Sequence, residues 1–429
     1  SSEDKTSFLL KVILPAKNGK PCVHCKTCSI TNGLAGAGAF SDGKFNLGTA
    51  YGGTLGEELG DAEAMVCIQE LDSILDQFSA NYPDIYYSNE ELRRTCIQNG
   101  LQLLDMNVRH LGTDKNYTTM YNIIQHLKNN IKIMTNNTCM DIDRDTEGNY
   151  LVTLHNNKTA TKVLCKNIII ATGRSGAEFV NNICNKFNIN VSSNHVDIGV
   201  RVEMPDLVWK HFSEKIYEPK IIYRTKTFGD KCRMFCFNQG GIVSAENNHG
   251  IITANGHSYA DKSKKTDNCN FAILSSIHFT EPFNKPTEYA ENISKLANMI
   301  GDGNVIVQRF GDLIRGRRTN EHRLSQSTVV PTLKATPGDL SLVLPHRILT
   351  NIIETLQALD KVAPGCANDD TLLYGCESKY YSIKPEHDND FMITENMYLI
   401  GDGSGICRGL SQSGAMGLCV ADRIINKEK

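Results

Sequence analysis

Three cysteines at Cys-x-x-Cys-x-x-Cys spacing, Cys22, Cys25 and Cys28, stand directly before a glycine-rich run. Thiolates at such spacing ligate iron–sulfur clusters or zinc, and both kinds of site need a fourth ligand. No fourth cysteine follows locally, although His24 is close in sequence. The same thiols could instead form a redox-active pair or pack inertly beside a loop. We therefore assign no metal site and keep an iron–sulfur cluster on these cysteines as an alternative.

A glycine turn near the C-terminus could hold an anion or a flat ring. An apolar strand ends in Gly401-Asp402-Gly403-Ser404-Gly405, and a helix is predicted to begin after Gly409. Glycines let backbone N–H groups approach a ligand closely, and the helix N-terminus adds about half a positive charge. Asp402 could accept a hydrogen bond from a sugar-alcohol hydroxyl. The alternative is an ordinary tight turn in which Asp402 only caps the backbone.

A second turn of the same kind lies earlier in the chain. Residues 167–171 are almost continuously apolar, which is typical of a strand buried on both faces of a parallel sheet. Thr172 and Gly173 follow as a tight exit from that strand. The two strand-turn units together favour a bound cofactor over two unrelated turns.

Arginines gather between residues 308 and 323, and a guanidinium group can bind a carboxylate or phosphate through two hydrogen bonds. We select Arg315 and Arg317 as a clamp for an anionic substrate. The alternative is a solvated basic face, or ion pairs with Asp312 and Glu321. The whole group comprises Arg309, Arg315, Arg317, Arg318 and Arg323.

His257, beside Tyr259, is a candidate proton donor, although a single histidine is often only a hydrogen-bonded surface residue. Arg201 lies in the apolar strand 199–203, where we expect it to pair with Glu203 on the same face.

The elements that must position these residues alternate along the chain. Helical spacing of apolar residues predicts amphipathic helices over 58–80 and 118–130, and short β-rich runs then lead to residue 171. From about 197 to 384, strands dominate the first half and helices follow. A terminal helix follows Gly409. We therefore predict an α/β fold with an inserted α+β substrate domain at 196–384, and the other domain formed by 1–195 and 385–429.

Bulk properties exclude several classes. A net charge of −3 over 429 residues gives no case for a nucleic-acid surface, and no apolar run approaches the roughly 20 residues that span a bilayer. The 15 cysteines are scattered through a long chain, which favours reduced thiols and a cytoplasmic protein over a disulfide framework. The sequence is compatible with an oligomer.

Ten segments, in order, resemble FAD-binding oxidoreductases of the two-dinucleotide-fold class. More narrowly, the chain is similar to bacterial FAD-dependent dehydrogenases often called NAD-utilising dehydrogenases. The segments are residues 25–45, 108–115, 171–180, 196–203, 217–228, 255–261, 308–319, 331–345, 371–382 and 400–409. The resemblance implies a Rossmann-like, glutathione-reductase-like FAD domain with a partly parallel sheet and a β-meander.

The resemblance also implies FAD as the cofactor and roles for matched residues. Residues 36–44 should form a loop beside the isoalloxazine, Asp402 should bind the ribityl chain, and the 409–413 turn should face the flavin pyrimidine edge. The implied cofactor-binding residues are Gly36, Ala37, Gly38, Phe40, Ser41, Asp42, Lys44, Thr172, Gly173, Gly401, Asp402, Gly403, Gly405, Gly409, Leu410, Gln412 and Ser413.

The start of the chain departs from that family pattern. Such proteins open with a Gly-x-Gly-x-x-Gly turn, whereas this chain begins at Ser1 and has no glycine before Gly19. We expect an incomplete N-terminal βαβ unit, or a variant that binds FAD poorly or not at all. No second such turn marks a nicotinamide site, so NAD(P) would have to approach the flavin directly.

The predicted function is a FAD-dependent oxidoreductase that moves a hydride or electron pair between the flavin and a small anionic substrate. Two alternatives remain open: a flavin-less binding or scaffold protein on the same fold, and an iron–sulfur flavoprotein.

Overall fold

The computed structural model divides the chain into two compact units. The first comprises residues 1–85, 107–192 and 382–429, and the second comprises 86–106 and 193–381. The structure describes residues 33–427 except 42, 106, 157–158, 174–175, 193–194, 249, 259–262, 264, 281, 284 and 380–381. Cys22, Cys25, Cys28 and Asp42 therefore lie outside the described residues.

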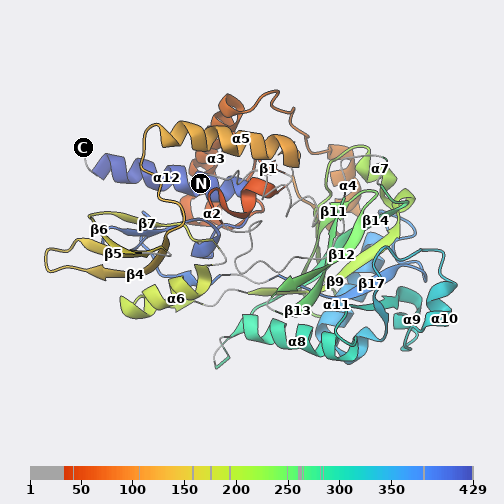
Figure 1. Cartoon of the computed structure of the whole chain (residues 1–429). Coiled ribbons are helices and arrows are strands. Elements are labelled where there is room, and N and C mark those ends of the chain that lie inside the picture. The colour runs from red at the N-terminus through yellow and green to blue at the C-terminus, as the bar shows by residue number, and fades with distance from the viewer. Residues whose placement is uncertain are drawn as a thin grey trace. The chain divides into compact units, whose positions relative to one another are not determined.

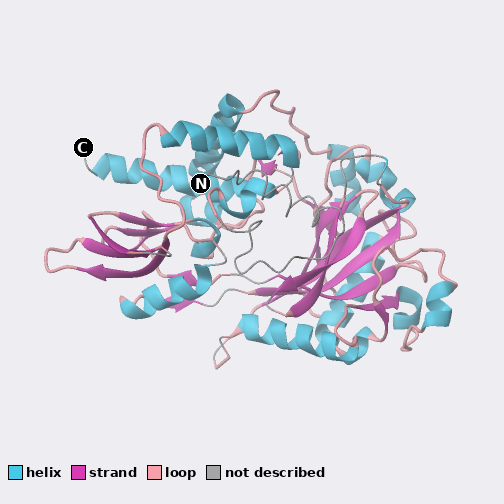
Figure 2. Ribbon diagram, viewed as in Figure 1, coloured by secondary structure: helices cyan, strands magenta, loops and turns pink. Residues whose placement is uncertain are grey.

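The first unit packs its long helices together (Figures 1 and 2). Buried apolar side chains of α3 and α12 share one cluster, which includes Ile68, Met416 and Val420. The helical elements are η1 (Gly36–Phe40), α2 (Leu55–Leu59), α3 (Asp61–Phe78), α5 (Thr113–Lys128), α6 (Ala177–Lys186), η6 (Gly401–Ser404) and α12 (Leu410–Lys427).

The predicted helix over 58–80 is interrupted. Gly60 has φ 82° and ψ 143°, a conformation that ends α2 and precedes α3. Only glycine adopts such an angle pair readily, so the break follows from the residue type. The helix predicted over 118–130 is confirmed as the larger part of α5.

The strands of the first unit form small sheets. β4, β5 and β6 make the antiparallel β-meander that the sequence predicted, and β7 runs parallel to β20. β1 pairs with β3, and β8 with β18. The strands are β1 (Lys44–Asn46), β3 (Val108–His110), β4 (Thr138–Arg144), β5 (Tyr150–His155), β6 (Ala160–Cys165), β7 (Ile168–Ile170), β8 (Val191–Ser192), β18 (Lys384–Pro385), β19 (Met392–Thr394) and β20 (Met397–Leu399).

The second unit is built on an eight-stranded mixed sheet of order β16-β15-β17-β9-β14-β11-β10-β2. The separate hairpin β12–β13 packs near β9, β14 and β17. The strands are β2 (Leu101–Leu103), β9 (Val196–Pro205), β10 (Ile221–Arg224), β11 (Lys231–Asn238), β12 (Ile242–Asn248), β13 (Ile251–His257), β14 (Asn268–Ile277), β15 (Ile306–Arg309), β16 (Thr336–Pro337) and β17 (Leu372–Lys379).

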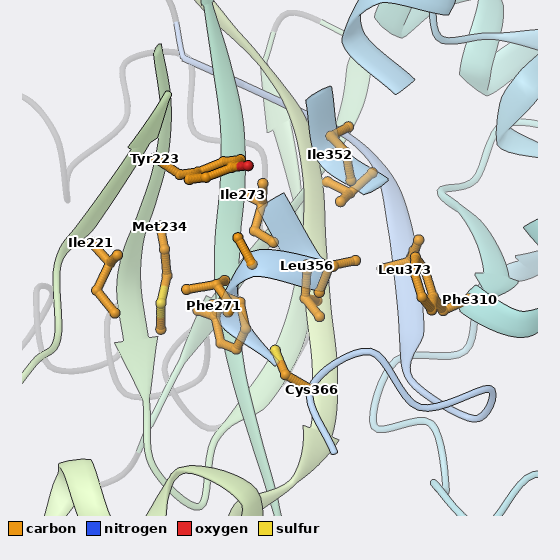
Figure 3. Close-up of a cluster of buried hydrophobic side chains, with 14 of the residues drawn as sticks. Ile221, Tyr223, Met234, Phe271, Ile273, Phe310, Ile352, Leu356, Cys366 and Leu373 are labelled. Carbon is orange, nitrogen blue, oxygen red and sulfur yellow. The ribbon is translucent and has the colours of Figure 1, made fainter. Parts of the chain in front are cut away.

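One face of this sheet carries the main hydrophobic core. Alternate residues of β9 (Val196, Ile198, Val200, Val202 and Met204) belong to it, as the two-residue period of a strand requires. Figure 3 shows Phe271 and Ile273 of β14 beside Ile352 and Leu356 of the helix α11 (His346–Leu359). Full burial of each such side chain contributes about 1.5–3 kcal/mol.

The long helices α8 and α11 lie in the later half of the second unit, where the sequence predicted helices to follow the strands. α4 and the edge strand β2 come from residues that the sequence assigns to the other domain. The helical elements are α4 (Glu90–Gln98), η3 (Asp206–Trp209), α7 (Lys210–Ser213), α8 (Pro286–Ile300), α9 (Phe310–Ile314), α10 (Glu321–Ser325), η5 (Leu340–Leu342) and α11 (His346–Leu359).

The opposite face of β9 holds a buried ionic network. Arg201 pairs with Glu377, not with Glu203, so the predicted pairing is wrong. Its Nη2 donates to Glu377 Oε1 at 2.8 Å, and its Nε lies 2.8 Å from Oε2. Glu203 instead accepts hydrogen bonds from the hydroxyls of Thr332 and Tyr374. The two strands β9 and β17 bring Arg201 and Glu377 together across a bulge between Gly375 and Glu377, which the local sequence does not indicate.

Within the described residues, no helix combines the length and apolar character that crossing a bilayer would demand.

Candidate functional site

Two of the predicted cofactor turns meet in the first unit. β7 and β20 are parallel neighbours with Ile170 opposite Leu399, so their carboxyl ends lie at the same sheet edge. A Cβ atom on Gly403 would lie 3.2 Å from the Gly173 carbonyl oxygen. Gly173 itself has φ 61°, and nothing described lies within 4 Å of its Cβ position. The turns thus meet closely, and space remains beside the half-buried Gly173.

The start of α12 presents free backbone donors. The helix begins at Leu410, so the N–H groups of its first turn have no acceptor within the helix. The Arg408 and Gly409 N–H groups both donate to the Gly52 carbonyl oxygen at 2.8 Å. The hydroxyl of buried Ser411 has no hydrogen-bond partner among the described residues. Such a terminus can accommodate a negatively charged ligand.

Gln412 ties this helix terminus to the loop that precedes α2. Its carboxamide nitrogen donates to the carbonyl oxygens of Thr49 (3.1 Å) and Tyr51 (3.0 Å), and its oxygen accepts from the Leu55 N–H (3.2 Å). These three bonds involve only the side chain. The implied cofactor contact through the backbone N–H groups of the 409–413 turn stays a prediction. Neighbouring Leu410 and Ser413 make no comparable cross-links among the described residues.

The predicted flavin-facing loop is held by a residue that the sequence did not single out. Asn116, buried on α5, donates from Nδ2 to the Gly38 carbonyl oxygen at 2.7 Å, with the Ala39 and Ser41 oxygens at 3.3 Å. A Cβ on Gly38 would lie 2.8 Å from Leu410 Cδ2, so η1 reaches the start of α12. An asparagine within a helical run gives no sequence signal for this role.

The remaining predicted cofactor residues are distributed as follows. Gly36 (φ 57°) begins η1, and Lys44 starts β1 opposite His110. Gly401 begins η6, and Gly405 (φ 73°) packs against the carbonyl oxygens of Ser382 and Ile383. Ala37 and Phe40 belong to the backbone of η1.

Burial and nearby carboxylates set the protonation of Cys407, which follows the 401–405 turn. Burial raises the pKa of the Cys407 thiol well above its usual range, and the negative charges of Asp402 and Glu58 raise it further. Cys407 is therefore a neutral thiol at physiological pH. Among the residues that the structure describes, no group of three or more His, Cys, Asp or Glu side chains could hold a metal ion.

The predicted substrate residues belong to the second unit and already have partners. Arg315 Nη2 lies 2.7 Å from Asp369 Oδ2, and Arg317 Nε lies 2.7 Å from Asp312 Oδ1. Both side chains keep about half of their surface exposed, at 49% and 48%. His257 ends β13 opposite Ile242. The anion clamp and the proton donor stay predictions.

Asp312 organises the arginine group and supports a pH prediction. Burial alone would raise the pKa of Asp312, but Thr319, Arg317 and Arg309 hold it below its usual range.

A carboxyl group whose pKa is lower in the folded than in the unfolded protein stabilises the fold at pH values above its unfolded pKa, which is about 3.9 for aspartate. That stabilisation is lost as the pH falls through the pKa of the folded state. We expect Asp312→Asn to lower stability at pH 7 and to flatten the loss of stability as the pH falls below about 4. Urea unfolding at a series of pH values, followed by the fluorescence of Trp209, the sole tryptophan, measures the free energy of unfolding of both proteins. An unchanged acid slope would contradict this assignment.

Comparison with known proteins supports a flavin-linked family. Residues 196–380 match the family described as "FAD-dependent protein, C-terminal domain-like". An uncharacterized protein of Clostridium beijerinckii is 24% identical over 340 residues, which cover 74% of this chain and 62% of the relative. The chain thus spans less than two thirds of that relative's length. The family match supports the prediction of a FAD-dependent protein over residues 196–380.

Solved structures of flavoenzymes superpose only in part. A 3-ketosteroid dehydrogenase of Rhodococcus jostii is 10% identical, and the superposition has a TM-score of 0.40. The aligned part covers 92% of this chain and 89% of the dehydrogenase. A p-nitrophenol 4-monooxygenase of Pseudomonas putida is 10% identical, with a TM-score of 0.32. The aligned part covers 86% of this chain and 69% of the monooxygenase. TM-scores this low carry no functional argument. The functional proposal therefore uses the family match and not these superpositions.

Proposed function

We propose that the protein is a FAD-dependent oxidoreductase that moves a hydride or electron pair between the flavin and a small anionic substrate. The observation that carries the proposal is the match of residues 196–380 to a FAD-dependent family. The meeting of the turns at Gly173 and Gly403 in the other unit supports it, because a cofactor needs space beside the backbone at glycine turns.

The residues of the first unit fit such a cofactor. Asp402 would accept from ribityl hydroxyls, Gly403 and Gly405 would face the pyrophosphate, and the first N–H groups of α12 would stabilise negative charge on the ring. When bound, FAD supplies the two-electron chemistry, while the protein supplies binding, orientation and electrostatics. Asn116 and Gln412 would fix the loops on either side of it.

The substrate side rests on the second unit. The half-exposed guanidinium groups of Arg315 and Arg317 each retain donors beyond the one bound to a carboxylate, and these could bind an anion. His257 would exchange a proton with the substrate. NAD(P) is the alternative partner for the electrons, and would reach the flavin directly.

The purified protein should carry flavin or bind added FAD, with the absorption bands of an oxidised flavin. Asp402→Ala should weaken FAD binding roughly 10- to 150-fold, because a hydrogen bond to a charged group is worth about 1.5–3 kcal/mol. Flavin fluorescence titration measures the affinity, and far-UV circular dichroism checks that the variant is folded.

Asp84→Ala is the matched control, since Asp84 is an exposed carboxylate of the same unit outside the turns. Equal FAD affinity in both variants would show that Asp402 does not bind the cofactor. A folded wild-type protein that neither contains nor binds flavin would overturn the proposal in favour of a binding or scaffold role.

A further inference from the structure

Two buried cysteines face each other across the packed helices α3 and α12. Cys67 lies on α3 and Cys419 on α12, and both belong to the same buried cluster. Neither forms a disulfide in the structure. The sequence offers no hint of the pairing, because the two residues lie near opposite ends of the chain.

The contacts on either side fix the register of the two helices. One turn along α3, Leu71 Cδ2 would lie 2.7 Å from a Cβ on Gly414, so the helices approach closely there. One turn in the other direction, Glu63 Oε1 lies 2.8 Å from Arg423 Nη2. Cys67 falls between Glu63 and Leu71 on α3, and Cys419 falls between Gly414 and Arg423 on α12. The helices therefore run antiparallel with the two thiols at the same level.

The hydrogen bonding distinguishes the two sulfurs. The Cys419 thiol donates to Glu63 Oε1, with Sγ 3.9 Å from that oxygen, and a side-chain hydrogen bond joins Cys419 and Cys67. Burial raises the pKa of Cys67, and the bond from Cys419 partly offsets this. The pKa of Cys419 is raised to about 12, chiefly by burial. Because the Glu63 carboxylate lies against Cys419, we assign Cys67 as the attacking sulfur.

We propose that Cys67 and Cys419 are a redox-sensitive dithiol that hydrogen peroxide converts to a disulfide in the folded protein. The Cys67 thiolate attacks one peroxide oxygen, the O–O bond breaks, and water leaves after protonation. The Cys419 sulfur then attacks the resulting sulfenic acid, the S–O bond breaks, and a second water leaves. The two thiols lose two electrons and two protons, and the peroxide is reduced to two waters. The inference does not depend on FAD binding.

Peptide mapping tests the proposal sharply. Trypsin should release residues 45–93 and 409–423, each with a single cysteine. The reduced, folded protein is treated with hydrogen peroxide, denatured in an alkylating agent and digested. We expect the two peptides to appear as one linked species, about 2 Da lighter than their sum. Its rate of formation should rise roughly tenfold per pH unit from pH 7 to pH 8, because the thiolate is the nucleophile.

Three controls make the outcome decisive. Cys419→Ser should abolish the linked species and leave Cys67 as sulfenic or sulfinic acid. Cys96→Ser, at a buried thiol on α4, should leave the linkage unchanged. Protein unfolded in urea should give at least about tenfold less of the linked pair, since the fold brings the thiols together. Oxidation of other cysteines without this linkage, or equal yield in urea, would overturn the proposal.

Discussion

Gly53→Ala should destabilise the first unit by about 3 kcal/mol or more and abolish flavin binding. Gly53 has φ 139°, which side-chain-bearing residues rarely adopt. A Cβ there would lie 2.4 Å from the Ile406 carbonyl oxygen, 2.5 Å from Gln412 Oε1 and 2.8 Å from Cys407 Cα. Because two of these atoms are backbone, the loop itself would have to move. The Thr54 N–H bond to Ile406 (2.8 Å) and the Gln412 contacts would then be lost.

Gly48→Ala is the matched control for this change. Its φ is ordinary and no described atom lies within 4 Å of its Cβ position, so we expect a change within about 0.5 kcal/mol. Urea unfolding followed by far-UV circular dichroism measures both variants, and Trp209 fluorescence reports on the second unit separately. If Gly53→Ala unfolds like Gly48→Ala, the close contact between the loop and α12 is incorrect.

Glu377→Gln is expected to destabilise the second unit by about 3–5 kcal/mol. The change removes the negative charge that lies against fully buried Arg201, and Lys379 Nζ also lies 3.3 Å from Glu377 Oε1. The Arg201 charge would then remain buried without its counter-charge, and the Lys379 ammonium, whose side chain is 26% exposed, would lose the same partner. The Trp209 unfolding midpoint measures the loss. The double variant Arg201→Met/Glu377→Met should recover most of the stability, since it removes both charges.

Glu91→Gln is the comparison for an exposed pair in the same unit. Glu91 Oε2 lies 2.6 Å from Lys215 Nζ, but both side chains remain in contact with solvent. Solvent screening makes such pairs weak, so the Trp209 midpoint should hardly change. Equal effects of Glu377→Gln and Glu91→Gln would show that burial does not control the energetics of the network.

Elements with a strong local period could be predicted from the sequence. The apolar spacing of α5, α11 and α12 and the apolar run of β7 each identify one element without reference to the rest of the chain. The glycine turns after β7 and β20 could be recognised in the same way, and the parallel pairing of these strands then places the turns together.

Features that depend on distant partners could not be predicted. Arg201 was expected to pair with Glu203 because both lie on one face of a strand, but the neighbouring strand β17 supplies Glu377 instead. Asn116 and Gln412 are ordinary helix residues by local pattern, and only the fold brings backbone carbonyls to their carboxamides. The break at Gly60 was visible as a residue type but hidden within a strong amphipathic run.

The bond between Gln412 and Tyr51 has a consequence for synthesis. It joins residues 361 positions apart in the chain. The Gly52 carbonyl oxygen likewise accepts its hydrogen bonds from Arg408 and Gly409, which are synthesised much later. A ribosome produces the loop before α12, and a chain lengthens at about 5–20 residues per second. The loop is therefore without these hydrogen-bond partners until residues about 360 positions later in the chain have been made. All residues of the second unit precede α12 in the chain. The second unit can therefore complete its sheet before α12 of the first unit has been synthesised.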